Sequence, residues 1–228
     1  MSDPIELFID NSKEVKALIA IHEEKTGKNP GRRSGVEILN KSGIVLLTAC
    51  WEAFIEDAAS TAFRFMLEES ADPKQLPKGV LKRVAAYVKK DVNELRVWDL
   101  SRDGWKQVLR DYRDEILRPQ IGIFNSPKAG NVDRLFDALL DLPELSKNWH
   151  WQGMGVEAAR TRLKDYVELR GAIAHRVKAS RSVYKGNVSD YAEFITRLAV
   201  RSANVVRKHV SSLVRKYPWE AYHIGSFR

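Results

Sequence analysis

Residues 43–57 read Gly-Ile-Val-Leu-Leu-Thr-Ala-Cys-Trp-Glu-Ala-Phe-Ile-Glu-Asp, and this stretch decides the fold. Between Ile44 and Ile55 it is apolar on almost every side of a helix, with Glu52 as its one carboxylate. A helix that is apolar all round is buried by other elements rather than lying on a surface. We therefore expect a long helix from about Val36 to Ser70 to form the buried centre of a helical bundle.

The rest of the chain also has the hydrophobic period of α-helices, and no convincing run of alternating strand residues interrupts it. No linker is long enough to separate two domains, so residues 1–228 are expected to form a single all-α bundle of about six or seven helices. The expected helices are Ile5–Lys25, Val36–Ser70, Val80–Lys89, a helix capped by Ser101 that ends before Pro119, Val132–Leu142, Val156 to about Ala179, and Ser189–Tyr217 with Ser189 as its N-cap.

Composition places the chain among ordinary soluble globular proteins. It is 44% hydrophobic and 30% charged, which excludes a disordered chain, a collagen and a small disulfide scaffold. Cys50 is the only cysteine, so no internal disulfide forms; we interpret it as a small buried hydrophobe in a reducing cytoplasm. Residues 1–10 lack the features of a signal peptide, and the apolar runs are shorter than the ~20 residues that span a bilayer. We expect a cytoplasmic protein with no membrane partner.

Positive charge is concentrated in the last third of the sequence. The net charge is +8, yet residues 156–228 hold 15 Lys and Arg against 6 Asp and Glu, a net of +9, and the remainder has a net of −1. Such an asymmetry is typical of proteins that bind a polyanion, most often a nucleic acid. The alternative interpretation is a set of solvated basic helix faces.

Several kinds of chemistry leave no trace in the sequence. It has no GxxxxGK[ST] loop, no GxGxxG after a strand and no GxSxG elbow. Its five histidines show no metal-binding spacing, and one cysteine does not make a structural zinc site. We therefore expect neither a metal nor a cofactor.

The basic third contains an arginine where a buried residue is expected. The apolar stripe of this helix runs through Val156, Ala159, Leu163, Val167, Arg170, Ala174 and Val177. A guanidinium on such a stripe is costly unless it is paired or lines a cleft. His175 follows five positions later, a rise of ~7.5 Å and a rotation of ~140° on an ideal helix. Either Gly171 allows a local distortion, or the pair completes a site only with another helix or subunit.

Glu52 and three tryptophans are the remaining residues of interest. Glu52 is the expected partner of Arg170 and would orient it, whereas a different salt bridge or simple exposure is the alternative. Trp51, Trp149 and Trp151 are expected to pack in the core, although tryptophans can also stack on nucleic-acid bases.

Three segments together resemble the HEPN superfamily of small all-α domains, many of which are RNases. Arg170-Gly-Ala-Ile-Ala-His175 is similar to the HEPN signature, an Arg followed four to six residues later by His. Residues 43–57 resemble the central helix of the RiboL-PSP-type branch, and residues 124–136, Phe-Asn-Ser-Pro-Lys-Ala-Gly-Asn-Val-Asp-Arg-Leu-Phe, resemble the segment before its catalytic helix. The resemblance covers about residues 36–215. Residues 1–35, a helix and loop, and the aromatic tail, 216–228, lie outside it.

The resemblance implies a metal-independent endoribonuclease whose Arg170 and His175 are catalytic. It implies a homodimer that brings both copies of the pair into one groove, because one protomer offers a single well-placed His. The sequence departs from the family at Gly171, where many members carry Asn, Asp or His. Residues expected to contact RNA flank the motif: Lys164, Arg176, Lys178 and Arg181.

Three functions remain open on the sequence alone. The first is a homodimeric RNase of a toxin–antitoxin pair or of phage defence, held in check by an antitoxin or regulatory partner protein. The second is a non-catalytic HEPN-like module that binds RNA or a nucleotide, which Gly171 favours. The third is a plain helical scaffold in which Arg170 and Glu52 form a structural pair. Whether the aromatic tail docks on its own subunit or on a partner is also open.

Overall fold

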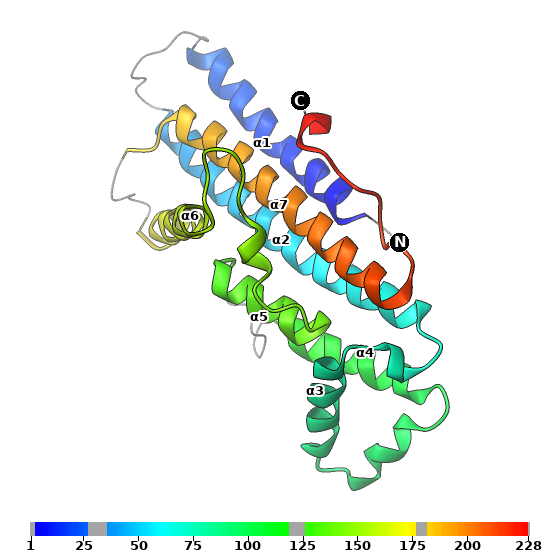
Figure 1. Ribbon diagram of the computed structural model, residues 1–228. Coiled ribbons are helices and arrows are strands. Elements are labelled where there is room, and N and C mark those ends of the chain that lie inside the picture. Colours follow the sequence, from blue (N-terminus) through cyan, green and yellow to red (C-terminus); the bar gives the residue numbers. More distant parts are fainter. Residues whose placement is uncertain (1–2, 27–35, 119–125, 177–181, 228) are drawn as a thin grey trace.

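The computed structural model describes residues 3–26, 36–118, 126–176 and 182–227. These residues form α-helices and short 3-10 helices with no β-strand among them, so the all-α prediction is confirmed (Figure 1). The α-helices are α1 Pro4–Thr26, α2 Glu37–Glu69, α3 Lys78–Lys89, α4 Gly104–Leu117, α5 Ala129–Leu140, α6 Val156–Arg176 and α7 Lys185–Val214. The 3-10 helices are η1 Pro73–Gln75, η2 Glu94–Leu100, η3 Leu145–Asn148 and η4 Ile224–Phe227.

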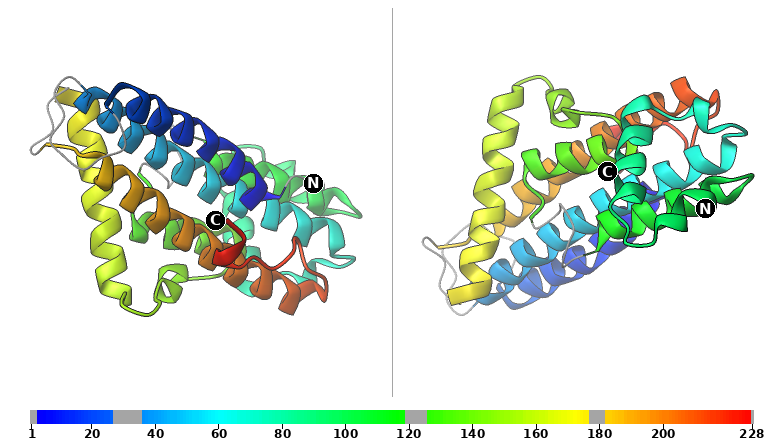
Figure 2. Two further views of the ribbon diagram at one scale, coloured as in Figure 1. Left: turned by 90° about the horizontal axis from the view of Figure 1, so that it is seen from above. Right: turned by 90° about the horizontal axis from the view of Figure 1, so that it is seen from below.

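Helix α2 is the centre of the bundle, as its composition predicts. It runs between α1 and α7, and α5 and α6 pack against it as well (Figures 1 and 2). Its large side chains Trp51, Phe54 and Phe63 are fully buried. Cys50 is buried too, and burial raises the pKa of its thiol. By length and composition α2 is apolar enough to cross a membrane, but half of that stretch is buried inside the bundle, as in the core helix of a soluble protein.

Helix α1 belongs to the same hydrophobic core, although residues 1–35 lie outside the sequence resemblance. Ile5, Phe8 and Val15 are buried against the bundle. The ring of Phe8 meets that of Phe54 edge to face, with centroids 5.6 Å apart. Such an aromatic pair adds about 0.5–1.5 kcal/mol beyond the area that it buries.

Both ends of α7 differ from the prediction. Ser189 lies inside the helix, which begins four residues earlier because the Tyr184 amide donates to Asn187 Oδ1 (2.9 Å). The helix ends at Val214 rather than Tyr217, because Arg215 adopts a left-handed conformation with φ 62°. Local capping, rather than hydrophobic periodicity, therefore sets its length.

Helices α4 and α5 are shifted in a similar way. Asp103 rather than Ser101 holds the N-cap position of α4, because the Ser101 amide instead closes η2 by donating to the Trp98 carbonyl (3.0 Å). Helix α5 begins three residues before Val132, and it ends at Leu140 because Asp141 is left-handed with φ 54°. Periodicity located these helices but did not fix their ends.

Helix α6 and the aromatic tail complete the C-terminal half of the structure. Helix α6 crosses one end of the bundle at a steep angle to α2 and α7 (Figure 2). The aromatic tail folds back onto α7 of its own protomer, where the Trp219 Nε1–H donates to the Ala203 carbonyl (3.2 Å). Asn204 and the Tyr222 backbone exchange two hydrogen bonds of 2.8 and 3.1 Å.

Candidate active site

The three segments that resemble HEPN sequences meet in space. Trp51 Nε1 of α2 donates to the Pro127 carbonyl (2.9 Å), which fixes the start of the 126–136 segment on the central helix. In the next position of that segment, Lys128 Nζ lies 2.9 Å from Glu168 Oε1 of α6. Helices α2, α5 and α6 are thus joined at the level of the Arg-x4-His motif.

Arg170 lies on the side of α6 that faces α2. Its Nη2 is 3.9 Å from Glu52 Oε2, and the two side chains are 39% and 30% exposed. This is the pairing expected for Glu52, the one carboxylate between Gly43 and Ile55. The contact is long for a hydrogen bond, so the guanidinium retains unused donors at a partly open surface.

The apolar stripe of α6 is close to that expected, with one error. Ala159, Leu163 and Val167 are buried, but Ala174 is exposed and Ile173 packs against the core instead. At 100° per residue Ile173 lies on the same side of α6 as the buried Tyr166 and Leu169, whereas Ala174 lies about 100° away from Ile173. Val177, the last residue of the expected stripe, lies outside the described residues.

His175 lies near the end of α6 and is exposed. It forms no hydrogen bond or ion pair with any residue that the structure describes. At 100° per residue it shares a face with Glu168, seven positions earlier, and is about 140° from Arg170. Within one protomer the two motif side chains therefore point to different sides of the helix.

Gly171 does not distort α6, which is continuous from Val156 to Arg176. The distortion expected as one alternative is therefore absent. A side-chain Cβ placed at Gly171 would meet no atom within 4 Å, so the position is open to a larger residue. A side chain at this position would therefore extend into open space among the described residues.

The acidic residues on α2 lie in a partly buried row. Burial is the main cause that raises the pKa of Glu56, and the nearby charges of Glu52 and Asp57 add to it. Burial also raises the pKa of Asp57. Glu52 and Arg170 therefore lie beside carboxylates that are partly removed from water, and removing either charge changes the electrostatic environment of those carboxylates.

The expected RNA-contacting residues fall into two groups. Lys164 is exposed and lies 4.0 Å from Glu168, on a side of α6 about 120° from Arg170. Glu168 has a lowered pKa, first because Lys128 donates a hydrogen bond to it. The side chain of Arg176, and Lys178 and Arg181 altogether, lie outside the described residues.

The tryptophans divide between core and surface. Trp51 and Trp149 are fully buried, and Trp149 Nε1 donates to Ser202 Oγ (2.9 Å), so base stacking is excluded for both. Trp151 is only half-buried. It lies two residues after the core tryptophan Trp149, in a tight turn whose Gly153 has a φ of 81°.

Sequence reasoning missed the residues that hold α6 in place. Tyr166 of α6 stacks on Tyr191 of α7 with ring centroids 3.9 Å apart, and the Tyr191 hydroxyl lies 3.0 Å from Thr48 Oγ1 of α2. Burial raises the pKa of Tyr191. Lys128 was part of the recognised segment, but no local signal shows that it meets Glu168, forty residues later.

A family model described as RiboL-PSP-HEPN matches residues 7–207, which include most of α1 and most of α7. The family domain therefore begins before residue 36, where the sequence resemblance placed its start. No curated protein and no solved structure gave a match. Within the described ranges, no three His, Cys, Asp or Glu side chains come together as a metal site requires.

Proposed function

Because the chain belongs to the RiboL-PSP-HEPN family, we propose that it is a metal-independent endoribonuclease with Arg170 and His175 as its catalytic residues. The observation that carries this proposal is the state of Arg170. It is half-buried, and Glu52 at 3.9 Å is its only ion-pair partner among the described residues. Its remaining donors are available to the oxygens of a phosphate, which a guanidinium binds bidentately.

The proposed reaction is an internal transfer at phosphorus. One His175 imidazole accepts the proton of a ribose 2′-OH as the 2′-oxygen attacks the adjacent phosphate. The bond from phosphorus to the 5′-oxygen breaks, and a second imidazolium gives that oxygen a proton. Arg170 binds the non-bridging oxygens and stabilises the charge that grows on them. The products are a 2′,3′-cyclic phosphate and a 5′-hydroxyl, and DNA is not cut because it lacks the nucleophile.

Two copies of the chain are needed to supply these groups. Arg170 and His175 point to different sides of α6, and a single protomer has one motif histidine for two proton transfers. A two-fold contact between the α6 helices of two copies is proposed to bring both motif pairs into one groove. His175 of the partner subunit is then the second proton-transfer group.

Glu52 is proposed to position Arg170 rather than to contact RNA. Its carboxylate restrains the guanidinium from α2 and offsets part of its charge when no phosphate is bound. The basic residues Lys164, Arg176, Lys178 and Arg181 are proposed to contact the RNA backbone.

The biological setting that fits best is a toxin of a toxin–antitoxin pair or an effector of phage defence in the cytoplasm. An RNase of this kind is harmful unless controlled, so an antitoxin or regulatory protein is the proposed partner. Expression of the wild-type chain is expected to be toxic, and His175→Ala is expected to remove the toxicity.

The direct test is RNA cleavage in excess EDTA with the new ends mapped. Wild type and Lys82→Ala, a control at an exposed lysine of α3, are expected to leave cyclic phosphate and 5′-hydroxyl ends. His175→Ala is expected to leave the RNA intact. No cleavage by wild type, or equal cleavage by His175→Ala, contradicts the proposal.

A binding module is the second candidate, and Gly171 favours it. Many family members have a polar residue there, whereas this chain offers only open space beside the motif. Salt-dependent RNA binding without cleavage by the wild type would identify this function.

A further inference from the structure

Two cavities lined by described residues lie along one side of helix α7, both away from Arg170 and His175. The first, which we call the α6–α7 cavity, has a volume of about 350 Å³. The second, the tail cavity, has about 390 Å³ and is closed on one side by the tail residues Tyr222 to Ile224. Both volumes lie within the range of small-molecule sites, about 300–1,000 Å³.

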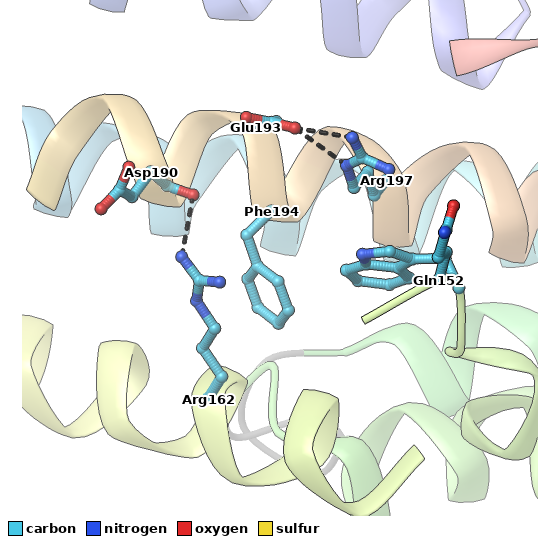
Figure 3. A pocket seen from close by; sticks show the side chains of 7 residues that line it. Gln152, Arg162, Asp190, Glu193, Phe194 and Arg197 are labelled. Carbon is cyan, nitrogen blue, oxygen red and sulfur yellow. Dashed lines mark hydrogen bonds and ion pairs between the residues drawn. The ribbon is translucent and has the colours of Figure 1, made fainter. Parts of the chain in front are cut away.

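Aromatic rings form one wall of the α6–α7 cavity. Trp151 and Phe194 lie with ring centroids 6.0 Å apart, and the Phe194 ring is buried while the indole is half-exposed. Figure 3 shows the side chains of Arg162 and Phe194 entering the same space from α6 and α7. The indole Nε1 has no hydrogen-bond partner in the part of the chain that the structure describes. A flat group that enters here meets an aromatic face and an unused donor.

The charges of this cavity are balanced. Glu193 Oε1 accepts two hydrogen bonds from Arg197, at 3.0 and 2.7 Å, and so neutralises it. Arg162 reaches across from α6 to the Asp190 carbonyl (3.4 Å), beside that residue's carboxylate. Two cations and two carboxylates line the cavity together with the rings. Such a lining suits a neutral planar group better than a phosphate.

The tail cavity has the opposite character. Arg201, Lys208, His150 and His223 line it, and none of the described residues around it is Asp or Glu. Arg201 Nε is buried without a hydrogen-bond partner among the described residues, and no carboxylate of those residues pairs with the guanidinium. A buried donor on a cation is costly to leave unpaired. This cavity therefore suits an anion.

Arg201 connects the two cavities. It lines the tail cavity, and its guanidinium carbon lies 5.9 Å from the centre of the Trp151 ring, which lines the α6–α7 cavity. Arg197, one turn earlier on α7, lies 5.7 Å from the same ring. The aromatic α6–α7 cavity and the cationic tail cavity are thus side by side. At the end of the α6–α7 cavity formed by α6, Arg162 is two turns from Arg170, a distance of about 12 Å along the helix axis.

We infer that these adjoining cavities bind a single-stranded segment of the RNA substrate, with one base against Trp151 and a backbone phosphate in the tail cavity. The inference rests on the proposed function, since it assigns a further contact of the same RNA. It places strand binding on α7 and the 148–152 segment rather than only around the Arg-x4-His motif. Stacking on tryptophan accepts every base, so this site fixes the path of the strand more than its sequence.

The test measures binding of a 2′-O-methyl oligonucleotide, which lacks the nucleophile and is not cut. Two exposed lysines without an ion pair among the described residues form a matched pair: Lys208, which lines the tail cavity, and Lys82 of α3. Each phosphate contact on a single strand contributes about 0.7 to the slope of log affinity against log salt. Lys208→Gln should lower that slope by about 0.7. Over the tenfold range from 1 M to 0.1 M salt, the variant should therefore gain about fivefold less affinity than the wild type. Lys82→Gln should leave both unchanged.

The base contact has its own variant. Trp151→Leu is expected to weaken binding of the oligonucleotide roughly tenfold, but to leave binding of an abasic strand of equal length unchanged. Equal slopes for Lys208→Gln and Lys82→Gln, or an equal loss of both strands on Trp151→Leu, would overturn the inference. Because no cleavage is measured, a wild type that binds as described but never cuts RNA contradicts the proposed function alone. A wild type that cuts RNA while Lys208→Gln matches Lys82→Gln contradicts this inference alone.

Discussion

Arg83 and Arg170 are almost equally exposed, at 33% and 39% of their side chains, yet they use their donors differently. Arg83 joins α3 to the end of α5: it lies 2.6 Å from Asp137 and 3.2 Å from Asp141, and it donates to the Asp137 carbonyl (2.8 Å). Arg170 has the 3.9 Å contact with Glu52. The α3–α5 contact uses the donors of Arg83 within one chain, whereas Arg170 in the α2–α6 contact keeps donors that no described residue uses.

His175 should give the largest effect, because it has no partner among the described residues and is proposed to move protons. His175→Ala is expected to reduce RNA cleavage by about 10²–10⁴-fold while the melting temperature stays unchanged. Rates under single-turnover conditions and thermal unfolding of the same sample would measure both. A large fall in the melting temperature would instead show that His175 has a structural role, as Arg83 does.

The two arginines themselves should give opposite results. Arg170→Ala is expected to lower the cleavage rate by about 10²–10³-fold, with little change in stability, because charge stabilisation of the phosphate is lost. Arg83→Ala is expected to lower the free energy of unfolding by about 1–2 kcal/mol, because its charged hydrogen bonds are lost, and to leave cleavage by the folded protein unchanged. Chemical denaturation and cleavage assays separate the two outcomes. Equal stability losses for both variants would remove the distinction.

Glu52 should give a smaller effect than Arg170. Glu52→Gln keeps the shape but loses the charge, and we expect about a tenfold fall in kcat with KM little changed, because Arg170 is less well oriented. Glu56→Gln, one turn along the same helix, is the matched control and should leave kcat unchanged. If the two variants lower kcat equally, Glu52 acts only as one of several negative charges on α2 and does not orient Arg170.

Gly171 should give the smallest effect, in the direction of gain. Gly171→Asn has space for its side chain, and Asn is a better helix former than Gly by a few tenths of a kcal/mol. We expect cleavage to rise severalfold, because the amide adds a donor beside the phosphate, together with a slight gain in stability. A loss of cleavage with intact folding would show that the open surface at Gly171 is needed for close contact with the second copy.

Hydrophobic periodicity predicted the helical parts of this fold well. The continuous apolar character of residues 44–55 placed α2 at the centre, and the stripe on α6 predicted its buried face apart from Ala174. The same stripe showed Arg170 as an exception, and Glu52, the one carboxylate between Ile44 and Ile55, was its predicted partner. A charged residue on an apolar face can be recognised from the sequence, because burying its charge is costly unless a partner lies nearby.

Contacts between distant segments could not be predicted in this way. The cavity at Trp151 takes its lining from the turn at 151–152, from α6 and from α7, and no local pattern connects these three. Ser189 and Ser101 were plausible caps by residue type, but the Asn187 side chain and the closure of η2 set the helix starts instead. The second proton-transfer group is proposed to be His175 of another copy, and no contact within one chain can reveal it.

Mixed dimers test that claim most directly. Wild-type and His175→Ala chains are combined at known ratios under conditions that exchange subunits, and RNA cleavage is measured against the wild-type fraction. If both proton-transfer groups come from two copies, only dimers with two wild-type chains cut, and an equal mixture keeps about a quarter of the activity. If the equal mixture keeps about half, so that activity falls in proportion to the wild-type fraction, each chain holds a complete site and the composite site is contradicted.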